Sequence, residues 1–148
     1  MLVSSKFLNI LVRCMTAILC FSVAELTATE MSLTIKPCPN KPNCVSSIDE
    51  STSHYIEPFS FNGNFDSTKI KLLSAINALP RTKIIRENDN YLHVTFTSAL
   101  FRFVDDVEFY FDEVRKVIHL RSASRAGYYD FGANRHRIET IRAKYSEQ

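Results

Sequence analysis

The sequence predicts a single two-layer α+β domain, in which an antiparallel sheet of about four strands is covered on one face by helices. Two observations lead to this fold class. Two segments carry an apolar residue at every third or fourth position, which is the period of a helix buried on one side. Between these segments apolar and polar residues alternate, which is the pattern of strands with one buried face. A chain of 148 residues has room for one such domain.

The first 24 residues are expected to be a targeting segment. Residues 1–13 carry two cations and no acid, an apolar run of about ten residues follows, and Ser22-Val-Ala24 offers small residues that a signal peptidase recognises. The apolar run is shorter than the roughly 20 residues that span a bilayer. We therefore expect a cleaved signal peptide and export to the periplasm or the medium. The alternative is that residues 7–24 remain as an N-terminal membrane anchor.

The first part of the domain, which we expect over residues 36–148, is a loop. Residues 37–47 are rich in proline and asparagine, which argues against a helix or a central strand. Cys38 and Cys44 close this loop, and they are the cysteines that remain if the targeting segment is removed. In an exported chain such a pair forms a disulfide by default. The alternative is a reactive or metal-binding pair.

The first helix follows an irregular segment, residues 51–64, whose aromatic side chains are expected to lie across the core. Asp66 can cap this helix, because its side chain can accept hydrogen bonds from the amides of the first turn. Pro80 ends the helix after about 14 residues. The apolar positions at helical spacing are Ile70, Leu73, Ile76 and Leu79.

Four strands are expected after this helix, at residues 82–86, at residues 91–97, and on either side of a turn at residues 113–116. The third strand has its apolar residues at one parity: Phe101, Phe103, Val107, Phe109 and Phe111. Side chains of one parity share a face, so all five are expected to point into the core.

The register between the last two strands follows from side-chain chemistry. If Phe109 pairs with Leu120, the apolar faces of the two strands coincide. The same register places Glu108 opposite Arg121, so opposite charges meet on the other face. We therefore predict this register.

Asp105 breaks the apolar pattern of the third strand. It shares the parity of Phe103 and Val107, so an unbroken strand points it into the core. A buried carboxylate must be paired, protonated or turned outward, because burying the lone charge is too unfavourable. We expect an ion pair with Arg121 or Arg125, supported by the serines between them. The alternatives are a β-bulge that exposes the carboxylate and a catalytic role.

The segment 121–137 is the best candidate for a binding site. It holds four arginines and two of the three glycines of the chain, and Asn134 can cap a second helix with apolar positions at Ile138, Ile141 and Tyr145. Arginines beside the start of a helix can bind a phosphate, a sulfate or a carboxylate. The candidate ligand-binding residues are Arg121, Ser122, Ser124, Arg125, Asn134, Arg135 and Arg137. The alternative is that these arginines bind acidic residues of the same molecule.

Composition argues against several function classes. The chain has 18 basic and 16 acidic residues, and loss of Lys6 and Arg13 with the targeting segment makes the two numbers equal. A neutral domain is a poor binder of nucleic acid, so we expect no nucleic-acid partner. The acidic group at residues 105–108 lacks the glycine of a calcium loop, and the histidines have no zinc spacing, so we expect no metal site. Phosphate-binding, dinucleotide and nucleophile-elbow motifs are missing, so we expect no cofactor.

Three blocks of the sequence resemble a known family. They are Cys38-Pro-Asn-Lys-Pro-Asn-Cys-Val-Ser-Ser47, Phe103-Val-Asp-Asp-Val-Glu-Phe109 and Arg121-Ser-Ala-Ser-Arg-Ala-Gly-Tyr-Tyr-Asp-Phe-Gly-Ala-Asn-Arg-His-Arg137. In this order they are similar to the bacterial and plastid family called domain of unknown function 1499, over roughly residues 36–143. The resemblance implies one domain, often found in exported or envelope-associated chains. It implies no activity, cofactor or catalytic residue.

These observations favour a non-enzymatic exported or envelope module that binds a small anionic ligand or an envelope protein at residues 121–137. Contact with a membrane is expected only through an uncleaved N-terminus. The first alternative is a hydrolase or lyase that uses Asp105 or Asp106 as acid or base and Arg125 to stabilise charge. The second is a structural protein-interaction domain, marked by an exposed apolar patch over the aromatic segment 55–65.

Overall fold

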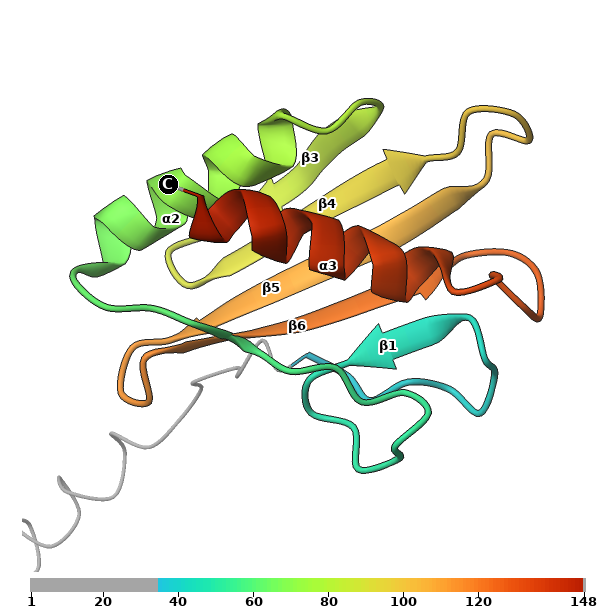
Figure 1. Ribbon diagram of the computed structural model, residues 1–148, viewed down its shortest axis with the longest axis horizontal. Helices are drawn as coiled ribbons and strands as arrows, with labels where there is room; N and C mark the ends of the chain where they lie inside the picture. The colour runs from blue at the N-terminus through green and yellow to red at the C-terminus, as the bar shows by residue number, and fades with distance from the viewer. Residues whose placement is uncertain (1–34, 148) are drawn as a thin grey trace, which may run out of the picture. The chain divides into compact units, whose positions relative to one another are not determined.

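Figure 1 shows a computed structural model of the chain, in which residues 35–147 are described. The predicted targeting segment lies outside the described residues. Among the residues described, no helix has both the length and the apolar character that crossing a membrane requires. In chain order the elements are β1 (Cys44–Ser46), β2 (Phe59–Ser60), α2 (Phe65–Asn77), β3 (Thr82–Glu87), β4 (Tyr91–Thr97), β5 (Val104–Asp112), β6 (Val117–Ser124) and α3 (Ala133–Ser146).

The α+β class and the antiparallel sheet are confirmed. Within the described residues the sheet has six strands in the order β1-β6-β5-β4-β3, and β2 also pairs with β6. Helices α2 and α3 lie on the same face of the sheet (Figure 1). The sheet has more strands than the four predicted because the prediction missed β1 and β2, which have only three and two residues. Strands this short are not long enough for an alternating pattern to appear.

The predicted register between β5 and β6 is also confirmed. Phe109 pairs with Leu120, and Glu108 pairs with Arg121. Strands β3 to β6 each pair with the strand next to them in the chain. As a result β4 and β6 end, and β5 begins, at the same end of the sheet.

The core lies between the sheet and the two helices. Leu72 and Ile76 of α2, with Ile138 and Ile141 of α3, are fully buried. The sheet side chains in the same cluster are Val45, Phe59, Leu92, Val94, Phe96, Val107, Phe109, Phe111, Ile118 and Leu120. Full burial of a side chain of this kind contributes roughly 1.5–3 kcal/mol before the entropy of ordering is counted.

Both helix starts differ from the prediction by a few residues. Asn64, and not Asp66, caps α2, and its Oδ1 accepts a hydrogen bond of 2.8 Å from the Ser67 amide. At the start of α3 the Asp130 carboxylate accepts from the amide of Asn134 at 2.9 Å. The N-cap position is Gly132, and the side chain that accepts from the first turn is that of Asp130, whereas we predicted Asn134, whose side chain is buried.

Strand β3 lies at an edge of the sheet, where it pairs with β4. The pairing is interrupted between Ile84 and Arg86, where the register shifts by a β-bulge or similar irregularity. Ile84 and Ile85 are 39% and 46% exposed. A bulge bends the strand and disturbs its ladder of hydrogen bonds.

Candidate functional site

Two loops lie at the end of the sheet where β6 ends and β5 and α3 begin, the elements that carry most of the residues that the sequence singles out (Figure 1). Residues 98–103 join β4 to β5, and residues 125–132 join β6 to α3. Both loops use left-handed backbone, with φ of 58° at Arg102, 86° at Gly127 and 55° at Phe131. Side-chain-bearing residues rarely adopt this conformation, so the surrounding structure holds the two loops in shape.

Asp105 is buried, with 6% of its surface exposed, and its partner is Arg137. We expected Arg121 or Arg125 instead. Arg121 is on the opposite face of the sheet, whereas α3 lies on the face to which Asp105 points. Arg137 also donates to Asn134 Oδ1 at 2.7 Å. The Asp105–Arg137 ion pair is thus an internal clamp between β5 and α3, in line with the expectation that a buried Asp105 is paired with a cation.

Asn134 is fully buried and connects three parts of the chain. Its amide nitrogen donates to the backbone oxygen of Asn43 at 2.9 Å and to Asp130 at 2.7 Å. Its oxygen accepts from the Ser122 hydroxyl at 2.6 Å, as well as from Arg137. These bonds leave the polar atoms of the Asn134 side chain occupied within the domain.

Asp106 points to the opposite face of the sheet from Asp105. Arg125 binds its carboxylate through two hydrogen bonds of 2.8 Å, and His93 Nε2 lies 2.7 Å from the same carboxylate. The hydrogen bond from Arg125 keeps the pKa of the Asp106 carboxyl below its ordinary value, although burial acts in the other direction. A carboxylate held ionised in this way is a poor general acid, which weighs against the enzyme alternative at this residue.

The other two arginines of the segment are also bound within the domain. Arg121 Nη1 lies 3.2 Å from Glu108, which accepts a second hydrogen bond of 2.6 Å from the Tyr91 hydroxyl. Arg135 donates to two backbone carbonyls of residues 53–55, at 3.1 and 2.8 Å. The four arginines therefore lie at different places and do not surround one common hollow.

The structure exposes aromatic side chains that the sequence pattern placed in the core. Phe101 and Phe103 are 70% and 54% exposed, because the left-handed residue between them interrupts the alternation and β5 begins only at Val104. In the other loop Tyr129 and Phe131 are 57% and 90% exposed. The rings are in contact within each loop, with centroids 5.6 Å and 5.0 Å apart.

These four rings line a hollow of about 290 Å³, which we call the aromatic hollow. Asp105, Arg137 and the hydroxyl residues Ser98 and Ser124 also line it. Aromatic walls with a few polar groups are the usual composition of a small-molecule site. Of the residues predicted to bind a ligand, Ser124 and Arg137 therefore reach a hollow together.

The exposed apolar patch over residues 55–65 that would mark a structural protein-interaction domain is not formed. Phe59 and Phe61 are only 2% and 4% exposed and belong to the core, while Tyr55 is 44% exposed. The exposed aromatic surface lies instead around the aromatic hollow. The alternative of a structural protein-interaction domain therefore lacks the surface patch that was to mark it.

A second hollow, of about 340 Å³, adjoins the first, since Ser98 and Arg137 line both. Arg81 and His136 line it as well, and no carboxylate does. Neither side chain forms an ion pair with any residue that the structure describes. Arg81 Nε donates to the Thr97 carbonyl at 3.0 Å. We call this the cationic hollow.

The sequence analysis did not single out Arg81 or His136, which line the cationic hollow together with Arg137. Arg81 follows Pro80 in the turn after α2, with φ of 60°, and His136 stands in the first turns of α3. Arg81 belongs to none of the three family-like blocks, His136 was not singled out within its block, and the two lie 55 positions apart in the numbering. The fold alone brings them together.

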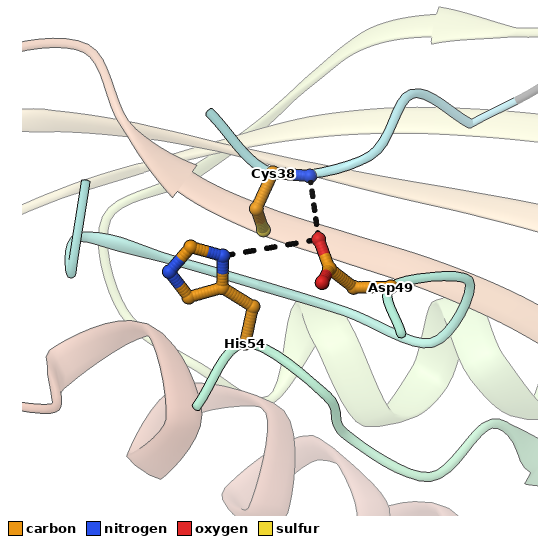
Figure 2. Close-up of side chains that lie close together, drawn as sticks. All are labelled: Cys38, Asp49 and His54. Atoms are coloured by element: carbon orange, nitrogen blue, oxygen red, sulfur yellow. Dashed lines mark hydrogen bonds and ion pairs between the residues drawn. The ribbon is translucent and has the colours of Figure 1, made fainter. Parts of the chain in front are cut away.

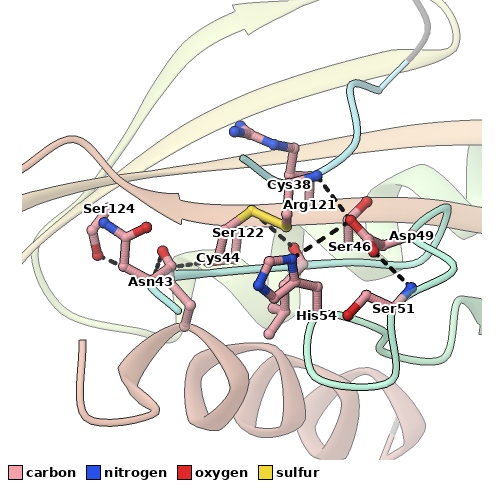
Figure 3. The surroundings of a disulfide bond; sticks show 12 residues. Cys38, Asn43, Cys44, Ser46, Asp49, Ser51, His54, Arg121, Ser122 and Ser124 are labelled. Carbon is pink, nitrogen blue, oxygen red and sulfur yellow. Dashed lines mark hydrogen bonds and ion pairs between the residues drawn. A yellow bond between two sulfur atoms is a disulfide. The ribbon is translucent and has the colours of Figure 1, made fainter. Parts of the chain in front are cut away.

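The predicted Cys38–Cys44 disulfide is present, with an S–S distance of 2.08 Å. Figure 3 shows Asp49 and His54 beside it. The Cys38 amide donates to Asp49 Oδ2 at 3.0 Å, and His54 Nδ1 lies 3.8 Å from the same oxygen (Figure 2). Within the described part of the chain, Cys38, Asp49 and His54 form the group whose ligand atoms meet closely enough to hold a metal, all within 4.8 Å.

Comparison with known proteins gives a family match. Residues 34–145 match the family model described as "Protein of unknown function (DUF1499)". The match spans all the described strands, α2 and nearly all of α3. No curated protein matches the chain.

Proposed function

The chain belongs to the DUF1499 family of proteins of unknown function, and on that premise we propose that it is a non-enzymatic module that binds an elongated, amphipathic anion. The apolar body of the ligand lies in the aromatic hollow, and its anionic group lies in the cationic hollow. The observation that carries the proposal is a cation-lined hollow without a carboxylate directly beside an aromatic-walled one. As the sequence analysis did, we propose a small anionic ligand, but we place its site away from Arg121, Arg125 and Arg135.

The cationic hollow supports an anion because the charge of Arg81 is not already neutralised, and the His136 ring can donate a hydrogen bond. Arg81 and His136 lack a carboxylate partner among the residues described, in contrast to Arg121, Arg125 and Arg137. A guanidinium forms strong, charge-assisted hydrogen bonds with a carboxylate or a phosphate. An anion entering this hollow therefore gains bonds without displacing an internal partner.

The aromatic hollow supports the opposite end of the ligand. Asp130 lines it and disfavours an anion there, while its four exposed rings favour an apolar body. The two hollows, at about 290 and 340 Å³, together fall within the size range of small-molecule sites. Charge thus sets the direction in which the ligand lies.

We also propose that the domain works outside the cytoplasm. The Cys38–Cys44 disulfide supports this, since disulfides form in oxidising compartments. The apolar and basic pattern of residues 1–24 supports it as well.

The test is calorimetric titration of the full chain with three probes: decanoate, acetate and the uncharged decanol. Decanoate is expected to bind most tightly, because it alone offers both ends. Arg81→Gln should weaken decanoate binding about tenfold and leave decanol binding unchanged, since it removes one charge-assisted bond. Arg102→Gln is the matched control, an exposed arginine of the same end that lines neither hollow. Equal effects of the two substitutions would rule the proposal out.

A further inference from the structure

Cys38, Asp49 and His54 form a compact cluster in the N-terminal part of the domain, and none of the three lines either hollow. The Asp49 and His54 side chains are only 10% and 13% exposed. Asp49 is held in place by hydrogen bonds from the amides of Cys38 and Ser51, at 3.0 and 2.9 Å. The cluster is therefore fixed by backbone contacts and does not depend on mobile surface side chains.

The chemistry of the three side chains matches a borderline divalent metal. Zinc takes thiolate, imidazole and carboxylate ligands at about 2.0–2.3 Å, which in a tetrahedral site places ligand atoms roughly 3.3–3.8 Å from one another. His54 Nδ1 and Asp49 Oδ2 are already 3.8 Å apart. Figure 2 shows the Cys38 sulfur pointing between the imidazole and the carboxylate. With all three ligand atoms within 4.8 Å, a shift of about 1 Å completes the geometry.

In the oxidised chain one ligand is blocked, because the Cys38 sulfur is bonded to Cys44 (Figure 3). A thiolate is the sulfur species that binds such metals. We propose that the cluster is a redox-gated site for a zinc-like divalent ion, which Cys38, Asp49 and His54 bind when the disulfide is open. A water molecule takes the fourth position.

A dithiol supplies the two electrons and two protons that open the disulfide. Its two thiols reduce the Cys38–Cys44 bond in a thiol–disulfide exchange, and the dithiol leaves as a disulfide. Cys38 and Cys44 each gain one electron and one proton. The metal then binds with release of the Cys38 proton.

The test uses Co²⁺, whose bond to a thiolate gives a charge-transfer absorption, and the full chain with Cys14→Ser and Cys20→Ser, so that no other thiol competes. The oxidised chain should give no thiolate–cobalt absorption. Adding Cys44→Ser, which frees the Cys38 thiol without any reductant, should give this absorption with one ion per chain. Treating the Cys14→Ser, Cys20→Ser chain with a phosphine reductant should give it too, and this arm decides the matter if Cys44→Ser fails to fold.

Two histidine variants then test the ligand set. In the Cys44→Ser chain, His54→Ala should weaken Co²⁺ binding at least about tenfold, because it removes a direct ligand. His93→Ala is the matched control, since this histidine on β4 lies beside Asp106 and is not part of the cluster, and it should leave Co²⁺ binding unchanged. The proposal is overturned if the reduced chain gives no thiolate–cobalt absorption, or if His54→Ala binds Co²⁺ as tightly as His93→Ala does.

Discussion

The Arg137 guanidinium of α3 forms an ion pair with the Asp105 carboxylate of β5. Both side chains are shielded, with 14% and 8% of their surfaces exposed. Arg137 also lines both hollows, and Asp105 lines the aromatic one. The proposed ligand site is thus built against a clamp between two regular elements, which favours a preformed shape.

Removal of one partner of this clamp should strongly destabilise the domain. We expect Asp105→Ala to lower the free energy of unfolding by about 3 kcal/mol, because it leaves the Arg137 charge buried and unpaired. Urea denaturation measures this loss. The double variant Asp105→Leu, Arg137→Met should lose less than the sum of the two single variants. A single-variant loss below about 1 kcal/mol would mean that solvent screens the pair.

Stability in acid should depend on Asp106. Its carboxyl pKa is lowered in the folded chain, chiefly by the hydrogen bond from Arg125. A carboxyl with a lowered pKa stabilises the fold above its unfolded pKa, near 3.9, and this contribution disappears as the pH falls through the folded value. We expect Asp106→Asn to reduce stability at about pH 7 and hardly at about pH 2, measured by urea denaturation. Asp89→Asn, on an exposed turn, serves as the control and should have no effect at neutral pH.

The buried amide of Asn134 should be as important as a core residue. Asn134→Ala removes the acceptor of the buried Ser122 hydroxyl and one of the two donors to the Asn43 carbonyl, so we expect a loss of about 3 kcal/mol in the free energy of unfolding. Asn77→Ala is the matched control, because Asn77 is exposed at the end of α2. Thermal and urea unfolding of both variants should agree, and similar losses in the two would show that the bonds of Asn134 contribute little.

The Cys38–Cys44 bond should stabilise the domain modestly. Its cysteines are six positions apart, and closing so short a loop restricts the unfolded chain by about 2 kcal/mol. We expect the double variant Cys38→Ser, Cys44→Ser to lose about this much free energy of unfolding and therefore to unfold at a lower urea concentration. An unchanged midpoint would mean that the loop is ordered without its cross-link.

Replacing Phe131 by asparagine should relieve backbone strain at this position. Its φ of 55° is unfavourable for a bulky residue, whereas asparagine adopts this conformation more readily. Phe131→Asn should therefore be more stable than Tyr129→Asn by about 1 kcal/mol, although both remove one ring of the same contact. Both variants should bind decanoate more weakly in calorimetry. If the two variants are equally stable, the backbone at Phe131 is not strained.

The sequence predicts the regular parts of this fold well because they follow local rules. Periodicity finds both long helices, and the pairing of Phe109 with Leu120 follows from matching the faces of two strands. The prediction fails at Phe101 and Phe103, where a single left-handed residue, Arg102, breaks the alternation. A rule of parity cannot detect such a break, because it assumes an extended backbone throughout.

The site was harder to predict because it depends on distant pairings. Sequence reasoning recognised that Asp105 needs a cation, yet α3 supplies Arg137 from 32 positions away. The arginines most noticeable in the sequence are bound internally, and Arg81 is noticeable only once the fold sets it beside His136. Local composition therefore pointed to the end of the domain where the two hollows lie and to Arg137, which lines both, but not to Arg81 or His136.

The irregular edge strand β3 has a consequence for behaviour in a crowded solution. A straight strand with exposed Ile84 and Ile85 would be a template on which a second molecule could extend the sheet. The interruption beside Arg86, together with the charges of Lys83 and Glu87, disrupts that template. Straightening this edge would expose the protein to fibre-like self-association, so the bulge protects against aggregation.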